Sequence, residues 1–94
     1  MKTKIKNRNQ MMQYIGKHMR FVKPSEDFNG DTDSIWVSGE DNDTFRGLPI
    51  YDYYASYESK SYELGVNVKW EEQIQKYGWW SEWHDCGTVM IHKD

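Results

Sequence analysis

The segment from Asn67 to Gly78 constrains the fold most, because it specifies an amphipathic helix whose apolar side needs a cover. Trp70, Ile74 and Tyr77 recur at the i, i+4 and i+7 spacing of a single helix face. Asn67 is a typical N-cap residue, and Gly78 is a typical residue just beyond a helix C-terminus. A helix with one apolar stripe requires a second layer, and we expect that layer to be a sheet.

Much of the remaining chain carries patterns that are typical of short strands and tight turns. Apolar and polar residues alternate in several stretches, and Pro, Gly, Asn and Asp separate these stretches. The predicted strands cover residues 17–23, 34–38, 48–54 and 61–66. The last two of them predict a hairpin that turns near Glu58 and Ser59, and residues 25–33 predict a loop. The sheet should therefore be mainly antiparallel.

The N-terminal part predicts a helix over residues 8–15, with Asn7 or Asn9 as its N-cap. Gly16 lies where a left-handed residue would end this helix. The alternative is a single helix that runs to Met19. It would place Gly16 in the helix interior, where glycine is less stable than alanine by about 1 kcal/mol.

The stretch that follows this helix predicts a strand over residues 17–23. Met19 and Phe21 would share one face of this strand because side chains alternate between faces. Pro24 would then end the strand, since proline has no backbone N–H to donate.

The last sixteen residues predict a hairpin whose register depends on the length of its loop. A two-residue loop, Cys86-Gly87, would mix apolar and polar side chains on each face. A three-residue loop, Asp85–Gly87, with its glycine in the left-handed conformation, separates them, and we expect this register. The apolar face then carries Trp79, Ser81, Trp83, Val89 and Ile91, and the other face carries Trp80, Glu82, His84, Thr88, Met90 and His92.

A chain of 94 residues suits a single domain spanning 1–94, with one core. Cys86 is the only cysteine, so no intramolecular disulfide can form. Aromatic residues make up 16% of the chain and should dominate the core. The basic start has no following apolar run of the kind found in signal peptides, so we expect a cytoplasmic protein. The predicted fold is α+β, a mainly antiparallel sheet of about five strands with one or two short helices packed on one face.

Charge is segregated along the chain. Residues 1–23 contain seven basic and no acidic residues, whereas residues 24–45 contain seven acidic and no basic residues. The basic residues lie largely in predicted helix and strand, and the acidic ones largely in predicted turns. We therefore expect the acidic loops to adapt to a binding partner more easily than the basic helix and strand.

No catalytic motif, metal site or cofactor site is recognisable, and we do not expect an enzyme. In the expected register His92 lies opposite Trp80 rather than His84, so three metal ligands do not converge locally. Whether His18 meets the other two histidines depends on the tertiary fold. Cys86 at a hairpin tip is more typical of a small turn residue than of an activated nucleophile.

These patterns favour protein binding, in which acidic loops and exposed tyrosines contact a cationic partner. The residues expected to bind the partner are Asp31, Asp33, Glu40, Asp41, Asp43, Tyr51 and Tyr53. The first alternative is nucleic-acid binding through cations that neutralise phosphates. Its residues are Lys2, Lys4, Lys6, Arg8, Lys17 and Arg20. The second alternative is an aromatic pocket that stacks on a nucleotide or another small ligand.

Four segments resemble small accessory proteins of tailed bacteriophages. They are Tyr62-Glu63-Leu64-Gly65-Val66, Lys76-Tyr77-Gly78-Trp79, the stretch from Glu82 to Val89, and residues 16–21. The resemblance implies that the chain works in the cytoplasm of a host cell. It also implies that the chain binds and modulates or inhibits a host or defence protein, as anti-restriction and anti-CRISPR proteins do.

Overall fold

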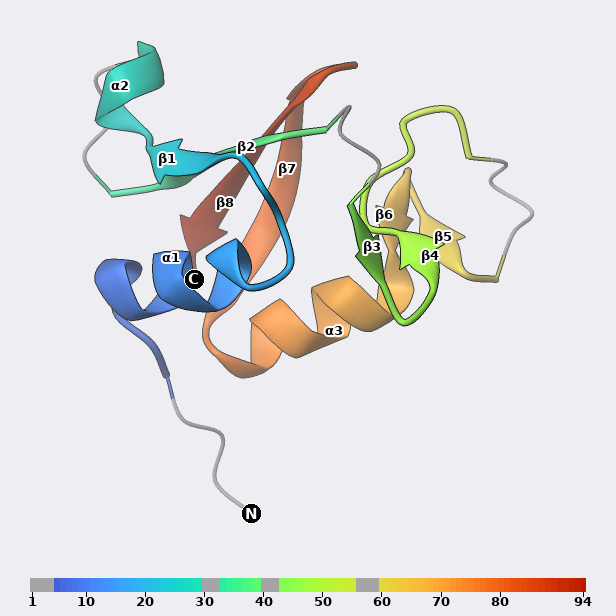
Figure 1. The fold of residues 1–94 in the computed structure, drawn as a ribbon, viewed down its shortest axis with the longest axis horizontal. Coiled ribbons are helices and arrows are strands. Elements are labelled where there is room, and N and C mark those ends of the chain that lie inside the picture. Colours follow the sequence, from blue (N-terminus) through green and yellow to red (C-terminus); the bar gives the residue numbers. More distant parts are fainter. Residues whose placement is uncertain (1–4, 30–32, 40–42, 56–59) are drawn as a thin grey trace.

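The chain has the α+β fold that its sequence predicts (Figure 1). The computed structural model describes residues 5–29, 33–39, 43–55 and 60–94. Within these ranges the helices are α1 (Arg8–Gly16), α2 (Glu26–Asn29) and α3 (Val68–Lys76). The strands are β1 (Val22–Pro24), β2 (Ile35–Ser38), β3 (Thr44–Phe45), β4 (Leu48–Pro49), β5 (Tyr62–Glu63), β6 (Val66–Asn67), β7 (Trp79–Asp85) and β8 (Thr88–Lys93).

The main sheet is antiparallel, with four strands in the order β1-β2-β8-β7. In its two central strands Ile35 pairs with Ile91 and Val37 pairs with Val89. Because side chains alternate between the faces of a sheet, all four lie on the same face, and all four are buried. Among the described residues this sheet has four strands where about five were expected, and β3–β4 and β5–β6 form two separate two-stranded sheets.

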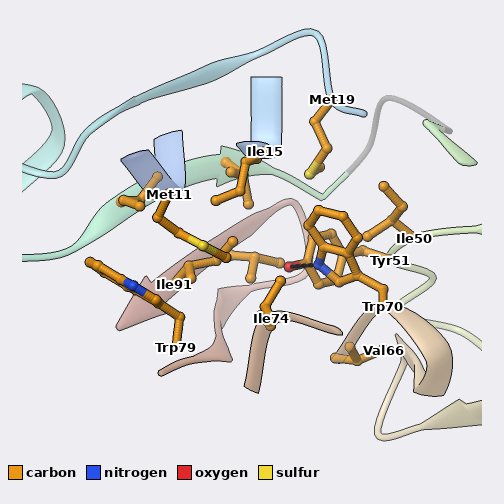
Figure 2. Packing of buried hydrophobic residues seen from close by; sticks show 13 residues of the cluster. Met11, Ile15, Met19, Ile50, Tyr51, Val66, Trp70, Ile74, Trp79 and Ile91 are labelled. Atoms are coloured by element: carbon orange, nitrogen blue, oxygen red, sulfur yellow. Dashed lines mark hydrogen bonds between the residues drawn. The ribbon is translucent and has the colours of Figure 1, made fainter. Parts of the chain in front are cut away.

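Helices α1 and α3 pack against this apolar face, and Figure 2 shows their buried side chains gathered around Ile91 of β8. Met11 and Ile15 from α1 pack in one cluster with Trp70 and Ile74 from α3. The indole Nε1 of Trp70 donates a hydrogen bond to the hydroxyl of Tyr51 at 3.0 Å. Only three of the thirteen buried residues of this cluster, Tyr51, Trp70 and Trp79, are aromatic, so the expectation that aromatic residues dominate the core is wrong.

Helix α3 forms where the sequence predicts it. The side-chain Oδ1 of Asn67 accepts hydrogen bonds from the backbone N–H groups of Lys69 and Trp70, at 2.9 and 3.3 Å. Gly78 follows the helix with a φ of 89°, a left-handed conformation that glycine adopts without steric penalty. Both predicted ends of α3 are confirmed.

Helix α1 also begins as predicted, but it ends differently. Asn7 forms a capping box with Gln10, in which each side chain bonds to the backbone N–H of the other residue. Gly16 is the last residue of the helix and does not adopt a positive φ, so the expected left-handed stop is wrong.

The strand predicted over residues 17–23 is also wrong for most of its length, because β1 starts only at Val22. The backbone N–H groups of Lys17, His18 and Met19 bond to carbonyls at the end of α1, so they cannot join a strand ladder. Met19 is buried whereas Phe21 is 56% exposed, so the two do not share a buried face. Pro24 lies inside β1 rather than beyond it.

Two tight hairpins, β3–β4 and β5–β6, lie between β2 and α3 in the chain. Their two-residue loops are Arg46-Gly47, with φ values of 55° and 84°, and Leu64-Gly65, with φ values of 51° and 77°. Positive φ at both loop positions is the requirement of a type I′ turn, which matches the twist of the adjoining strands.

The hairpin predicted over residues 48–66 is confirmed only around one residue pair. Tyr51 forms an antiparallel bridge with Val66, and the backbone N–H of Asp52 donates to the carbonyl of Gly65 at 2.8 Å. The predicted strand 48–54 is reduced to β4 and this bridge. The turn expected near Glu58 and Ser59 lies outside the described residues.

The C-terminal hairpin has the register that the sequence predicts, but a different loop. Trp83 pairs with Val89, and regular pairing runs from this pair back to Trp79, which lies opposite Lys93. The apolar and polar faces therefore separate as expected. Asp85, however, pairs with Thr88 across a two-residue loop, and Gly87 does not have a positive φ. A bulge between Trp83 and Asp85 takes up the extra residue instead.

Candidate functional site

The basic N-terminal segment and the acidic segment after it bond to each other in the fold. Arg8 contacts Glu26 through two hydrogen bonds of 2.6 and 2.8 Å. Arg20 contacts Asp43 at 3.1 Å through its side chain and at 3.0 Å through its backbone N–H. The hydrogen bonds from Arg8 lower the pKa of Glu26 to about 2. Three of the charges expected at partner or nucleic-acid surfaces, Arg8, Arg20 and Asp43, thus form ion pairs within this protein.

The two tyrosines expected to bind a partner occupy different environments. Tyr51 is only 5% exposed, and its hydroxyl bonds to Ser81 and to the indole of Trp70, so the expectation that it contacts a partner is wrong. Its bridge to Val66 holds it against the core. Tyr53 is 49% exposed and stays available for contact.

The other predicted binding residues are scattered or lie outside the described ranges. Asp33 and Lys17 are exposed. The Nζ of Lys6 lies 4.5 Å from the centre of the Tyr77 ring, a cation–π contact. The predicted residues that lie outside the described ranges are Lys2, Lys4, Asp31, Glu40 and Asp41.

The histidines do not converge on a common site. His18 packs among aromatic rings, including those of Tyr14 and Phe45 at 5.1 and 5.3 Å, and burial lowers its pKa. His92 bonds instead to Ser34 and Glu82. The described part of the chain contains no group of three or more His, Cys, Asp or Glu residues placed to hold a metal ion.

The structure instead brings together a surface that the sequence does not single out, which we call the acidic-aromatic groove. It lies between the β5–β6 hairpin, helix α3 and strand β7, and has a volume of about 530 Å³. Its carboxylates are Glu63, Glu71, Glu72 and Glu82. Its other lining residues are Leu64, Val66, Val68, Gln75, Ser81 and Trp83. No described Lys or Arg lines the groove, so it is acidic with a partly apolar wall.

Each wall of the groove follows from local structure. Val68, Glu72 and Gln75 recur along one side of α3 at helical spacing. β7 is an edge strand, so side chains from both of its faces, Glu82 and Trp83, reach the groove. The two-residue loop of the β5–β6 hairpin supplies the remaining wall.

Glu71, one of the residues that line the groove, has an unusual hydrogen-bond environment. Its Oε2 accepts hydrogen bonds from the backbone N–H of Ser81 at 3.1 Å and from Nε2 of Gln75 at 3.4 Å. Its Oε1 is buried and has no hydrogen-bond partner among the described residues. Because nearly all buried polar atoms in native proteins are paired, this oxygen needs an explanation.

The loop residue Leu64 presents its side chain to solvent at an energetic cost. It is 82% exposed and has a φ of 51°, which is unfavourable for a residue with a branched side chain. The indole Nε1 of Trp83 donates a hydrogen bond to the carbonyl of Leu64 at 2.8 Å, which helps to hold the loop in this conformation. The next residue must be glycine, because a Cβ at Gly65 would lie only 2.8 Å from the carbonyl oxygen of Asp52.

Exposed aromatic rings continue from this loop. The ring of Tyr53 lies 5.0 Å from that of Trp83 and 5.3 Å from that of Tyr54. Tyr54 is 82% exposed, as is Leu64. Leu64 and Trp83 line the groove, and the two tyrosines, which line a separate cavity, extend the exposed surface beyond Trp83.

Replacing Leu64 with asparagine is expected to raise the free energy of unfolding by about 0.5–1 kcal/mol, because asparagine tolerates a positive φ far better than leucine. Urea denaturation monitored by circular dichroism measures the change. Arg46→Asn, at the equivalent position of the other two-residue loop, is the matched control and should stabilise the fold similarly. A loss of stability in Leu64→Asn would mean that the leucine side chain supports the fold.

Comparison of the chain with protein-family models, curated proteins and solved structures found no significant match. The resemblance to bacteriophage accessory proteins therefore stays a prediction. Among the residues that the structure describes, no helix combines the length and apolarity needed to cross a lipid bilayer.

Proposed function

We propose that this chain is a non-enzymatic binding protein that modulates or inhibits a host or defence protein, and that the acidic-aromatic groove binds a cationic surface of that partner. The bacteriophage resemblance supports the choice of a host or defence component. The groove supports the chemistry of the contact.

The observation that carries the proposal is the set of four glutamates around one groove. Like charges held close together repel each other, and this repulsion is only partly offset by Lys69, whose Nζ lies 3.9 Å from Glu72, and by His92, whose Nε2 lies 3.0 Å from Glu82. A partner with a basic surface would relieve this repulsion, and complementary charge would also speed the encounter between the two proteins. The groove is therefore suited to a cationic partner.

The exposed side chains beside the groove supply the second part of a protein-binding surface. Affinity in protein interfaces comes mainly from a few large side chains that become fully desolvated. Leu64 and Tyr54 are each 82% exposed, and Tyr53 is 49% exposed. These three can be buried by a partner while the glutamates set its charge and orientation.

This proposal moves the acidic contact away from the loops expected from the sequence. Glu26 and Asp43 from the acidic segment already bond to Arg8 and Arg20, so they are less available to a partner. The groove glutamates come from the part of the chain beyond that segment. Tyr53 alone is retained from the described residues that were expected to bind.

A charge-reversal pair tests the groove. The double variant Glu63→Lys/Glu82→Lys should lose the partner, because it places two cations opposite a basic surface. The matched control, Asp27→Lys/Asp94→Lys, changes net charge equally at exposed positions outside the groove. Tagged forms of wild type and both variants are used to capture proteins from a bacterial lysate, and captured proteins are identified by mass spectrometry.

A protein captured by wild type and the control but not by the groove variant is then purified, and its affinity is measured by calorimetry at several salt concentrations. We expect the groove variant to bind about tenfold or more weakly, and wild-type binding to weaken with salt. Leu64→Asn should also bind more weakly, although it is more stable, whereas Arg46→Asn should bind normally. Equal affinity of the groove variant and the control contradicts the proposal.

A further inference from the structure

We propose that single-stranded nucleic acid binds to a second surface of this chain, which we call the aromatic row and which consists of Tyr77, Tyr14, His18 and Phe45. Unpaired bases would stack on these rings while the phosphates contact cations beside them. This inference goes beyond the proposed function, because it concerns a different ligand and a surface on the other side of α3 from the acidic-aromatic groove.

The four rings form a continuous row although separate parts of the chain supply them. The ring of Tyr14, in α1, lies 5.0 Å from that of Tyr77 and 5.1 Å from that of His18. The His18 ring lies 5.3 Å from that of Phe45, in β3. The fully buried Trp70 ring packs against three of the four, at 5.9, 5.6 and 5.4 Å from Tyr14, His18 and Phe45. The core therefore holds the row in place before any ligand binds.

The residues of the row keep part of their surface in contact with solvent. All four are half-buried, in contrast to Trp70, which they pack against. Aromatic rings that are fixed by a core and still reach water can stack with flat groups of a ligand, and nucleic-acid bases offer such groups along a single strand. Every base has a π-face, so this contact does not depend on the base sequence.

Cations stand at both ends of the row. The Nζ of Lys6 lies 4.5 Å from the centre of the Tyr77 ring, and the guanidinium carbon of Arg46 lies 5.5 Å from that of the Phe45 ring. Both side chains are long and flexible, so they can turn toward a phosphate while a base takes the ring face. Neutralising phosphates in this way releases counterions and favours binding.

The electrostatic surroundings of the middle of the row are also cationic. Burial lowers the pKa of His18, and the charge of Lys17 lowers it further. Burial raises the pKa of Tyr14, and the charge of Arg46 partly opposes that increase. Lys17 and Arg46 are both exposed, and neither forms an ion pair with a described carboxylate. Both charges are therefore open to an anionic ligand.

Helix α3 separates the aromatic row from the glutamates of the groove. Successive helical residues are rotated by about 100°, so Tyr77 and Glu71 flank the buried stripe of Trp70 and Ile74 on opposite sides. Tyr77 contacts Tyr14 of α1, whereas Glu71 lines the groove. A strand bound to the row is thus on the far side of α3 from the acidic surface.

A single strand fits this surface better than a duplex or an acidic peptide. The bases of a duplex are already stacked on one another, so their faces cannot reach the rings. An acidic peptide can contact the cations but leaves the rings unused. Of the cations that the sequence suggested for nucleic-acid binding, Lys6 and Lys17 belong to this surface, whereas Arg8 and Arg20 form ion pairs with carboxylates.

The test uses a twelve-nucleotide single strand of mixed sequence, prepared as DNA and as RNA. Each is titrated into the full ¹³C-labelled chain at about 50 mM salt, and the aromatic resonances are followed by NMR. We expect saturable upfield shifts of the Tyr14, His18 and Tyr77 ring protons, because a stacked base shields them. A duplex of the same sequence and a twelve-residue oligoglutamate, both followed by the same resonances and by anisotropy competition, should bind more weakly.

The salt dependence of binding checks the role of the cations. Fluorescence anisotropy of a labelled strand measures the affinity between about 50 and 200 mM salt. Three cations lie beside the row, Lys6, Lys17 and Arg46, and each phosphate neutralised on a single strand contributes about −0.7 to the log–log slope, so we expect a slope of about −2.

The double variant Lys17→Glu/Arg46→Glu reverses two exposed charges beside the row and should weaken binding of the single strand about tenfold or more. The matched control, Lys23→Glu/Lys60→Glu, makes the same change in net charge at exposed positions outside the row and should bind as wild type does. Circular dichroism verifies that both variants fold. If the first does not, the ring shifts and the competitors on the wild-type chain decide the question.

The absence of ring shifts with both strands, shifts confined to residues outside the row, or unchanged affinity in a folded Lys17→Glu/Arg46→Glu each overturn the inference. A duplex or oligoglutamate that binds as tightly as the single strand also overturns it. Ring shifts with DNA, RNA or both support it, and the tighter strand identifies the preferred sugar. Failure here leaves the proposed function standing, because Glu63→Lys/Glu82→Lys tests a different surface with a protein partner.

Discussion

Trp70→Ala is expected to lower the free energy of unfolding by about 3–5 kcal/mol, the range found when a fully buried large aromatic side chain is truncated. The Trp70 side chain is completely buried, and its ring lies between α1 and the β3–β4 hairpin, 5.9 Å from Tyr14 and 5.4 Å from Phe45. Truncation also leaves the buried hydroxyl of Tyr51 without one of its two partners. Because small domains have total stabilities of about 5–15 kcal/mol, much of the margin would be lost.

Urea denaturation followed by far-ultraviolet circular dichroism measures this loss without relying on the deleted fluorophore. The control is Trp70→Phe, which keeps an aromatic ring and removes the N–H donor to Tyr51. It should cost about 1–3 kcal/mol, less than the alanine variant. An unfolding free energy of Trp70→Ala within about 1 kcal/mol of wild type would contradict the position of this ring at the centre of the core.

Asn67→Ala is expected to lower the free energy of unfolding by about 2–4 kcal/mol, because this one side chain serves two elements. Its Oδ1 caps α3 through the N–H groups of Lys69 and Trp70. Its Nδ2 donates to the carbonyl of Phe45 at 3.2 Å, which ties the start of α3 to the β3–β4 hairpin. Asn67 is only 2% exposed, so water does not readily replace these bonds.

Thermal and urea denaturation of three variants separate the two roles. Asn67→Asp keeps the oxygen that caps α3 and removes the amide donor, so it should lie between wild type and Asn67→Ala. Asn7→Ala removes the exposed cap of α1 and should cost only about 1 kcal/mol. If Asn67→Ala cost no more than Asn7→Ala, the bond from Asn67 to Phe45 would contribute nothing to stability.

The parts of the fold that could be predicted from the sequence are those set by neighbouring residues. The stripe of Trp70 and Ile74, with Asn67 and Gly78 at its ends, determines α3 through local spacing and capping. The register of β7 and β8 could be predicted because only one alignment buries the apolar face. The bulge near His84 could not be predicted. A three-residue loop without a bulge and a two-residue loop with a bulge give the same pairing between β7 and β8.

The predictions from the sequence were wrong where a segment has two plausible local structures and contacts with distant residues decide between them. Residues 17–21 alternate like a strand, yet the N–H groups of residues 17–19 donate to carbonyls of α1 and that of Arg20 donates to the carboxylate of Asp43. The Leu64-Gly65 and Arg46-Gly47 loops were missed because leucine and arginine are poor residues for a positive φ, and only the glycines signalled a turn. A glycine after one unfavourable residue is a weak signal on its own.

Most of the candidate site could not be predicted from the sequence either, because tertiary contacts bring its residues together. Its four glutamates come from three elements, and each looks like an ordinary solvated residue in its own segment. The sequence did favour an acidic surface with exposed tyrosines, and Tyr53 fits that expectation. The acidic block of residues 24–45 drew attention instead, because clustering along a chain is easier to see than clustering in space.

The hydrogen bond between Ser81 and Glu71 also has a consequence for the edge of the main sheet. β7 is one edge of the main sheet, and an open edge strand invites a strand of another molecule to pair with it. Glu71 occupies one of the outward N–H groups of β7 and brings a negative charge to that edge. At the opposite edge, β1 is three residues long and ends in Pro24, which has no N–H to offer. Both edges of the main sheet thus offer fewer free backbone donors to a strand of another molecule than fully open edges would.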